Sequence, residues 1–443
     1  MNRFEGLLHW AFPAMLALAA VTILLSGRDL SQQYAELATV TEFAKHPAIA
    51  WLQRLVSLFL VIAAGERILS HFISRKHIPS PMLAGSYVIF WLATVGSPAV
   101  FGAHPQLAHD YLYALIVGVA VAMATGEEGH RILTMTRTAL FVFLLIGLAL
   151  IPVAPSLVLD SSYTQGLLPG VPRLGGVSPH PVALGMVALV FVLVLWAKPF
   201  SRKGLNFLAW TTGLASLFLA QSKTAWMAFI LCSAAMFLVR HSGNAWRRIG
   251  DPTRGEFGIL ACIGVMAGVL VVMGAILLGD IEGRALDFLD SPEGAQLATL
   301  TGRDRIWAVA AEEWAQNPVF GYGLGIWDAA FRASIDMPNA VNAHNQFMDA
   351  LSRSGVVGAA GLLLYAAVLM VLSVRYARAT GGLSLALFLA LALRCVSEVP
   401  LLLLGYGIEL VEHLLLIVTL ASAAAAPRPV ALQTGPAVYK VAS

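Results

Sequence analysis

Residues 301–355 are the longest polar interval of the chain and read TGRDRIWAVAAEEWAQNPVFGYGLGIWDAAFRASIDMPNAVNAHNQFMDALSRSG. Long apolar runs lie on both sides of this interval, at residues 256–279 and 355–374. A helix needs roughly 20 apolar residues to cross the hydrocarbon core of a bilayer. The interval is therefore expected to be a loop between two membrane-spanning helices.

The composition of the whole chain agrees with a membrane protein. Of its 443 residues, 58% are hydrophobic and only 12% are charged, whereas soluble domains carry roughly 25% charged residues. The small net charge of +3 gives no indication of nucleic-acid binding. Each of the three cysteines, Cys232, Cys262 and Cys395, lies in an apolar run, which favours packing over a disulfide or a zinc site.

Apolar runs of suitable length predict an all-α integral membrane protein with about twelve transmembrane helices. We expect nine of them in residues 1–279, a long loop with helices of its own in 280–354, three more in 355–425, and a tail in 426–443. The expected spans are 7–26, 48–65, 82–101, 108–125, 138–155, 180–197, 204–221, 224–240, 256–279, 355–374, 382–401 and 408–425.

The positions of Lys and Arg predict the orientation of the chain. They collect in every second short loop, as with Arg75 and Lys76 in the second and Arg202 and Lys203 in the sixth. Such loops remain on the cytoplasmic side. Both termini and the tail are therefore expected in the cytoplasm. The long loop is expected in the periplasm of a bacterial inner membrane.

Ionisable residues within or beside the spans all fall in their outer halves. Charges inside a membrane are costly and often mark functional sites, so this distribution favours a cavity open to the periplasm. Two structural interpretations stay open: Arg394 and Glu398 could neutralise each other, and Arg54 could reach lipid phosphates. The residues concerned are Arg54, His180, Lys223, Arg394, Glu398, Glu409, Glu412 and His413.

The first half of the long loop predicts an anion site. Apolar residues at helical spacing predict a helix over residues 304–316, and Arg303 and Arg305 stand at its start. A helix N-terminus with guanidinium groups suits phosphate oxygens, although an ordinary surface helix would begin in the same way. Asp304 is expected to cap this helix or to pair with one arginine.

The second half of the loop predicts a general base. His344 is expected in the first turn of a helix over residues 342–353, which Gly355 ends. Histidine is the commonest general base, and the neighbouring Asn345 and Gln346 can bond to sugar hydroxyls. A single histidine in a loop is more often structural than catalytic, so the prediction depends on the nearby arginines and the expected cavity.

Four motifs in order resemble the O-antigen ligase family, which shares its domain with O-antigen polymerases and protein O-oligosaccharyltransferases. They are Gly176-Val177-Ser178-Pro179-His180-Pro181, Gln221-Ser222-Lys223-Thr224-Ala225, Gly302-Arg303 with Trp307 and Pro318-x-x-Gly321-x-Gly323, and Ala343-His344-Asn345 followed by Gly355 and Gly358.

The resemblance implies a GT-C-type glycosyltransferase. Such an enzyme moves a glycan from undecaprenyl diphosphate to the lipid A–core oligosaccharide, in lipopolysaccharide biosynthesis, with inversion at the anomeric carbon. It implies neither a metal ion nor another cofactor, and a site at the periplasmic face of the inner membrane. The substrates would be the lipid-linked donor and the lipid A–core acceptor, with no nucleic acid.

The resemblance also implies roles for individual residues. His344 would take the proton of the acceptor hydroxyl. Arg303, Arg305 and Lys223 would bind the diphosphate, and Asn345 and His180 would also contact substrate. The family usually has Ser-Arg where this chain has Ser222-Lys223, and lysine loses the bidentate fork of arginine.

Three alternatives stay open. An O-antigen polymerase uses the same donor with a lipid-linked glycan as acceptor, and a protein O-oligosaccharyltransferase transfers to a protein. A transporter of lipid-linked glycans is the alternative outside enzymes. Inverted repeats and helices broken at the midplane would favour a transporter, and the sequence shows neither.

Overall fold

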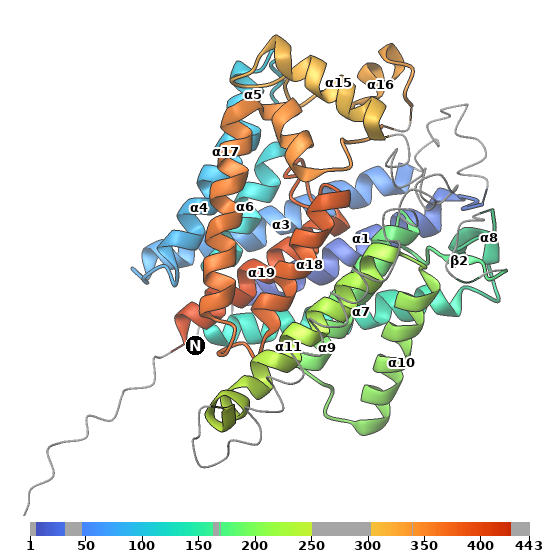
Figure 1. Cartoon of the computed structure of the whole chain (residues 1–443), viewed down its shortest axis with the longest axis vertical. Helices are drawn as coiled ribbons and strands as arrows, with labels where there is room; N and C mark the ends of the chain where they lie inside the picture. The colour runs from blue at the N-terminus through green and yellow to red at the C-terminus, as the bar shows by residue number, and fades with distance from the viewer. Residues whose placement is uncertain are drawn as a thin grey trace, which may run out of the picture.

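The structure is a computed structural model that describes residues 6–31, 47–162, 168, 170–249, 303–338 and 340–426. These residues are mostly helical, which confirms the expected all-α membrane class, and Figure 1 shows the helices as a bundle. The elements are η1 (Leu7–Trp10), α1 (Ala11–Ser26), α3 (Pro47–Ile73), α4 (Pro81–Trp91), η2 (Leu92–Gly96), α5 (Ser97–Phe101), α6 (Tyr111–Ala122), α7 (Gly126–Ala149), α8 (Pro155–Val158), β1 (Leu159–Asp160), β2 (Arg173–Leu174), α9 (Pro181–Ala197), α10 (Lys203–Leu219), α11 (Lys223–Ile249), α15 (Arg303–Gln316), α16 (Ala329–Ser334), α17 (Gln346–Arg375), α18 (Leu383–Ser397) and α19 (Ile408–Ala425). The strands β1 and β2 pair in antiparallel fashion.

Among the described residues, seven helical segments are long and apolar enough to cross a membrane, so the chain is a multi-pass membrane protein. They are Leu7–Ser26, Pro47–Ile73, Pro81–Phe101, Gly126–Ala149, Lys223–His241, Gln346–Arg375 and Ile408–Ala425. The helices α6, α9 and α18 are apolar but shorter. The expected span 256–279, residues 280–302 and the tail from 427 lie outside the described residues, and a total of twelve spans stays a prediction.

Two helices extend beyond the spans expected from hydropathy, because charged residues continue them. The helix α7 begins at Gly126 rather than near 138, since Thr125 and Glu128 form a capping box there. The helix α3 continues to Ile73 and contains Arg67, whose guanidinium lies 2.7 Å from the Glu128 carboxylate. Arg67, which lies past the end of the expected span 48–65, is therefore part of a helix and not of a connecting loop.

The centre of the bundle is α9, which is apolar on every side. Almost all of its residues from Pro181 to Leu195 are buried. It packs against α7, α10, α11 and α18, and α19 is similarly buried beside it. A helix that is hydrophobic all round belongs in a core or a membrane. Because α9 is packed on several sides, it holds the residues at its N-terminal end in a fixed position.

The segment from α15 to the first turns of α17 covers one end of the bundle, at the top of Figure 1. Residues 318–323 lie against residues 352–357, where Tyr322 and Gly323 donate backbone hydrogen bonds to Ser352 and Arg353. Gly355 bends α17 at this point with φ +61°. A Cβ atom on Gly355 would lie 2.4 Å from the Val319 carbonyl oxygen, so the close approach requires glycine.

Candidate functional site

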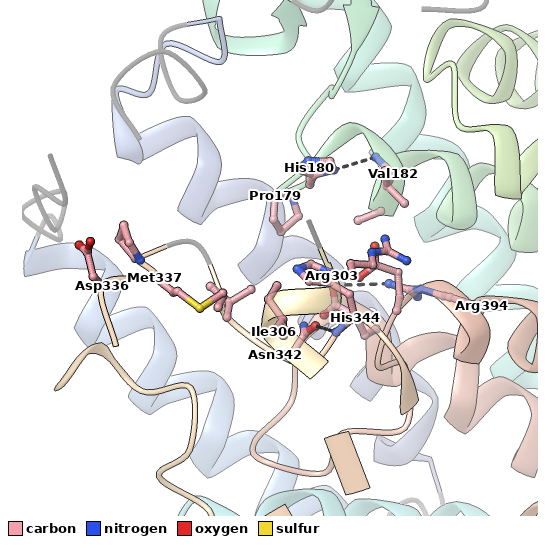
Figure 2. Close-up of a pocket in the computed structure, with 16 residues that line it drawn as sticks. Pro179, His180, Val182, Arg303, Ile306, Asp336, Met337, Asn342, His344 and Arg394 are labelled. Atoms are coloured by element: carbon pink, nitrogen blue, oxygen red, sulfur yellow. Dashed lines mark hydrogen bonds and ion pairs between the residues drawn. The ribbon is translucent and has the colours of Figure 1, made fainter. Parts of the chain in front are cut away.

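A polar cavity of about 670 Å³ lies where the segment from α15 to the first turns of α17 meets the helix bundle. Its walls come from the starts of α9, α15 and α19, the end of α18, and the connection between α16 and α17. Figure 2 shows Arg303, His344 and Arg394 gathered together in this cavity, with Asp336 and Met337 farther along it. The lining residues are Pro179, His180, Val182, Ala183, Arg303, Ile306, Asp336, Met337, Pro338, Ala340, Val341, Asn342, His344, Arg394, Glu398 and Glu409.

His344 lies just before α17 and not in its first turn as expected. The helix begins at Gln346, because the Asn345 side chain caps it by accepting from the backbone N–H groups of Phe347 and Met348, each at 3.0 Å. His344 itself has φ +46°, a left-handed conformation that is uncommon outside glycine. Such conformations persist where surrounding contacts enforce them, and they cluster at functional sites.

Contacts on both sides of His344 enforce its position. The Trp307 indole donates to the Ala343 carbonyl oxygen at 2.9 Å. The Ala343 backbone N–H donates to the Asp349 carboxylate at 3.1 Å, and Arg353 lies 2.7 Å from the other oxygen of that carboxylate. Since Asp349 and Arg353 are both buried, the histidine is supported by an ion pair that water does not reach.

Glu398 faces His344 across the cavity. Its Oε2 atom lies 3.4 Å from Nδ1 of the imidazole, and the two side chains are only 24% and 26% exposed. Glu398 follows the end of α18, outside the membrane-spanning helix. Burial acts to raise the pKa of its carboxyl group, but His344, Arg394 and Arg303 outweigh burial and hold this pKa below its ordinary value. Glu398 is therefore an anion at neutral pH.

Arg394 does not pair with Glu398, which corrects one structural interpretation of the sequence. Its guanidinium lies 3.3 Å from the carboxylate of Glu412 and 3.8 Å from that of Glu409. Glu398 leaves the helix in an extended conformation and turns toward the loop instead. The two residues are four apart in sequence but each has its partner on another segment, so the spacing alone could not assign the pairs.

Of the three cations expected to bind an anion, Arg303 alone lines the cavity. It is the first residue of α15, so a cavity residue stands at the N-terminus of this helix. Arg305 points elsewhere, and its exposed side chain donates to the Ile335 carbonyl oxygen at 3.3 Å. Lys223 is exposed at the start of α11 and does not line the cavity.

His180 lines the cavity from the other side, at the start of α9. Its Nδ1 atom accepts a hydrogen bond from the Val182 backbone N–H at 3.0 Å, as Figure 2 shows. The loop before it is held by Arg28, which donates to the carbonyl oxygens of Gly176, Ser178 and Pro179. Burial, followed by the charge of Arg173, lowers the pKa of His180 to about 4, so this imidazole is neutral at neutral pH.

Asn345 does not line the polar cavity but a neighbouring apolar groove of about 290 Å³ between α17 and α18. The upper end of this groove contains Asn345, Cys395 and Val396, each next to or near a residue of the polar cavity. Leu363, Ala366, Phe388 and Ala392 continue the groove along the helices. The polar cavity and the apolar groove thus lie close to each other at the end of α18 and the start of α17.

For several residues of the cavity, the sequence predicted ionisable groups within or beside the spans but no role in the site. Arg394, Glu398 and Glu409 come from three different points of the α18–α19 region. The signal that could have identified them is the presence of ionisable groups at span ends on one side of the membrane. Across the described ranges, no group of three His, Cys, Asp or Glu side chains is placed to hold a metal ion.

The fold and the cavity together define a multi-pass membrane protein that brings a histidine–carboxylate pair and two arginines into one polar site. Residues 207–366 match the family model described as O-antigen ligase. This match confirms the resemblance over those residues, and members of the matching family are glycosyltransferase-like enzymes. No curated protein matches the chain. The matched residues include Arg303 and His344, while His180 and Glu398 lie outside them.

Proposed function

We propose that this protein is an O-antigen ligase, a metal-independent inverting glycosyltransferase. It moves a glycan from undecaprenyl diphosphate to the lipid A–core oligosaccharide. The observation that carries the proposal is the His344–Glu398 pair in the same cavity as Arg303. These groups match the two demands of the reaction, which are removal of a proton from the acceptor hydroxyl and neutralisation of a diphosphate leaving group.

His344 is the proton acceptor in this mechanism. With Glu398 beside Nδ1, the favoured neutral tautomer carries its proton on Nδ1, which leaves the Nε2 lone pair for the acceptor hydroxyl. As the acceptor oxygen forms its bond to the anomeric carbon, its proton passes to Nε2. The Glu398 carboxylate then stabilises the imidazolium ion, as the aspartate of a serine–histidine–aspartate triad does.

Arg303 binds the leaving group. The bond between the anomeric carbon and the diphosphate oxygen breaks as the new bond forms, so the electron pair passes to the diphosphate. A guanidinium at a helix N-terminus is a suitable partner for that charge. Arg394 also reaches the cavity, but two carboxylates already hold it. Direct displacement from the opposite face inverts the configuration of the anomeric carbon.

The apolar groove between α17 and α18 suits the polyprenyl chain of the donor. It is lined mainly by aliphatic and aromatic side chains, and it begins beside the polar cavity. A lipid whose diphosphate lies at Arg303 would thus find an apolar path into the membrane. The adjoining cavity and groove together fit a substrate that is polar at one end and a long hydrocarbon at the other.

The site is proposed to face the periplasm of the bacterial inner membrane. The support is the distribution of Lys and Arg in the sequence, because the even-numbered short loops, from the second to the tenth, carry most of those in short loops and the cavity lies at the opposite helix ends. Both chain termini would then be cytoplasmic. The segment from α15 to the first turns of α17 would then contact lipid-linked substrates in the outer leaflet.

Polymerases and oligosaccharyltransferases share this domain, so the test must vary the acceptor. Purified protein is incubated with an undecaprenyl-diphosphate-linked glycan and one of three acceptors: lipid A–core, a second lipid-linked glycan, or a protein substrate. Transfer to lipid A–core, unchanged by EDTA, is the expected result. Preferred elongation of the lipid-linked glycan would indicate a polymerase, and movement of the donor across a vesicle membrane without transfer would indicate a transporter.

A further inference from the structure

A second cavity, of about 740 Å³, lies among α1, the first turns of α3 and α6, and the segment that leads into α19. That segment also borders the candidate active site. Gly405, Tyr406 and Gly407 line the second cavity, and Glu409, two residues later, lines the first. The two cavities therefore both reach the residues around the start of α19.

One wall of the second cavity is aromatic and held in place. The rings of Tyr113 and Tyr406 meet edge to face with centroids 5.6 Å apart, and His109 lies edge-on to Tyr113 at 5.9 Å. The Tyr406 hydroxyl donates to the Gln53 carbonyl oxygen at 2.8 Å and also bonds to the Ser57 hydroxyl. The electron-rich face of an aromatic ring attracts the C–H groups of a sugar ring.

The lining of this cavity also offers both a hydrogen-bond donor and an acceptor, Arg54 and Asp110. Arg54 stacks on Trp51 at 5.1 Å. In the described part of the chain, neither its guanidinium nor the Asp110 carboxylate has a hydrogen bond or ion pair with another side chain. Sugar hydroxyls donate and accept, so they suit such a pair. Asp110 would repel a phosphate group bound at Arg54, so these two side chains favour the sugar portion of a glycolipid over its phosphate groups.

The cavity also adjoins the lipid-facing side of α3. Leu58 lines it and is 58% exposed, and Leu55 and Ile62 are exposed on the same helix. Exposed aliphatic side chains on a membrane-spanning helix lie against lipid chains. A ligand can therefore place sugars against Tyr113 and Asp110 while its acyl chains remain in the bilayer.

We propose that the second cavity binds the sugars of the acceptor glycolipid, the lipid A–core, and presents them to the cavity that holds His344. This inference rests on the proposed function, because it assigns the acceptor of that reaction. The donor and the acceptor then approach His344 from two sides: the donor from the α17–α18 groove, and the acceptor from α3, α6 and the segment before α19.

The test measures equilibrium binding of purified lipid A–core glycolipid to the full-length protein in nanodiscs. The variants Tyr113→Leu and Asp110→Asn are compared with Phe72→Leu, which changes an exposed aromatic residue of α3 outside the cavity. Each cavity variant is expected to raise the dissociation constant about tenfold, the equivalent of one lost contact. Phe72→Leu should leave it unchanged. Phosphatidylglycerol, which has a phosphate but no sugar, should bind all four proteins equally.

Glycolipid binding within about twofold of wild type in both cavity variants would overturn the proposal. An equal loss of phosphatidylglycerol binding would also overturn it, since the cavity would then recognise lipids without regard to sugar. Because Asp110 is exposed, its replacement by the isosteric Asn keeps the fold.

A transfer assay separates the two proposals. A wild-type protein that binds the glycolipid through these residues but transfers no glycan contradicts the proposed function alone. In the two cavity variants, a rise in KM for the acceptor with an unchanged KM for the donor supports both the second cavity as the acceptor site and the proposed function.

Discussion

The substitution Glu398→Gln tests the role of the carboxylate without changing its size. Glutamine keeps a hydrogen-bonding oxygen next to His344 but removes the negative charge that stabilises the imidazolium ion. Coulomb's law gives about 5 kcal/mol for opposite charges 3.4 Å apart at an effective dielectric constant of about 20. Both side chains are about one quarter exposed. Partial screening by water therefore places the loss nearer 2 kcal/mol, between the values of exposed and buried pairs.

A loss of about 2 kcal/mol in the transition state lowers kcat roughly 30-fold. The assay is single-turnover transfer of the glycan to lipid A–core by purified protein at saturating donor and acceptor. The control is Glu312→Gln, the same chemical change on the exposed face of α15 and outside the cavity. A Glu398→Gln rate within about twofold of wild type, with the control also unchanged, would refute the assigned role.

The dependence of this effect on pH follows from the lowered pKa of Glu398. A carboxyl group with a lowered pKa is ionised throughout the neutral range, and its contribution is lost only as pH falls through the lowered value. The Glu398 carboxyl should therefore show the infrared band of a carboxylate from about pH 6 to 8, measured as the difference between wild type and Glu398→Gln. A band of a protonated carboxyl group between pH 6 and 7 would contradict the ionisation state assigned to Glu398.

Three further predictions concern binding and stability. Arg303→Ala should raise the dissociation constant of the lipid diphosphate about tenfold or more, whereas Arg305→Ala, whose side chain lies outside the cavity, should change it less than about threefold; equal effects would contradict the placement of the two arginines. Arg353→Met leaves the buried Asp349 carboxylate unpaired, so it should destabilise the protein by about 3 kcal/mol, seen as a lower Tm, while Arg375→Met at the exposed end of α17 should not. Ala392→Trp fills the apolar groove, so it should raise KM for a donor with a long prenyl chain but not for a short-chain analogue. The control is Leu364→Trp, at an exposed position of α17 outside the groove. The same rise in KM for both donors would show that the groove does not hold the chain.

The bundle could be predicted from sequence because apolar length is a strong signal. A chain that lacks water around it must satisfy its backbone internally, so long apolar runs become helices. The helix over residues 304–316 was also accessible, and the structure has it from Arg303 to Gln316. The ends of α7 were not, because the capping box at Thr125 extends the helix into a polar stretch that hydropathy assigns to a loop.

The site was predictable in part, for a different physical reason. Arg303 and His344 have chemical types and neighbours that suggest a role on their own, and they do line one cavity. Glu398 could not be assigned, since its spacing from Arg394 suggests a pair on one helix face. The structure ends the helix at Ser397, which turns Glu398 toward His344. The positions of Arg305 and Lys223 outside the cavity also depend on tertiary packing that no local pattern encodes.

The central claim, that His344 takes the proton of the acceptor hydroxyl, is tested most directly by His344→Ala. The purified variant is given undecaprenyl-diphosphate-linked glycan and lipid A–core, and both donor binding and transfer are measured. The account predicts that the donor still binds through Arg303 while transfer falls by about 100-fold or more, the usual contribution of a positioned general base. Transfer within about threefold of wild type, by a variant that binds donor normally, would contradict the account.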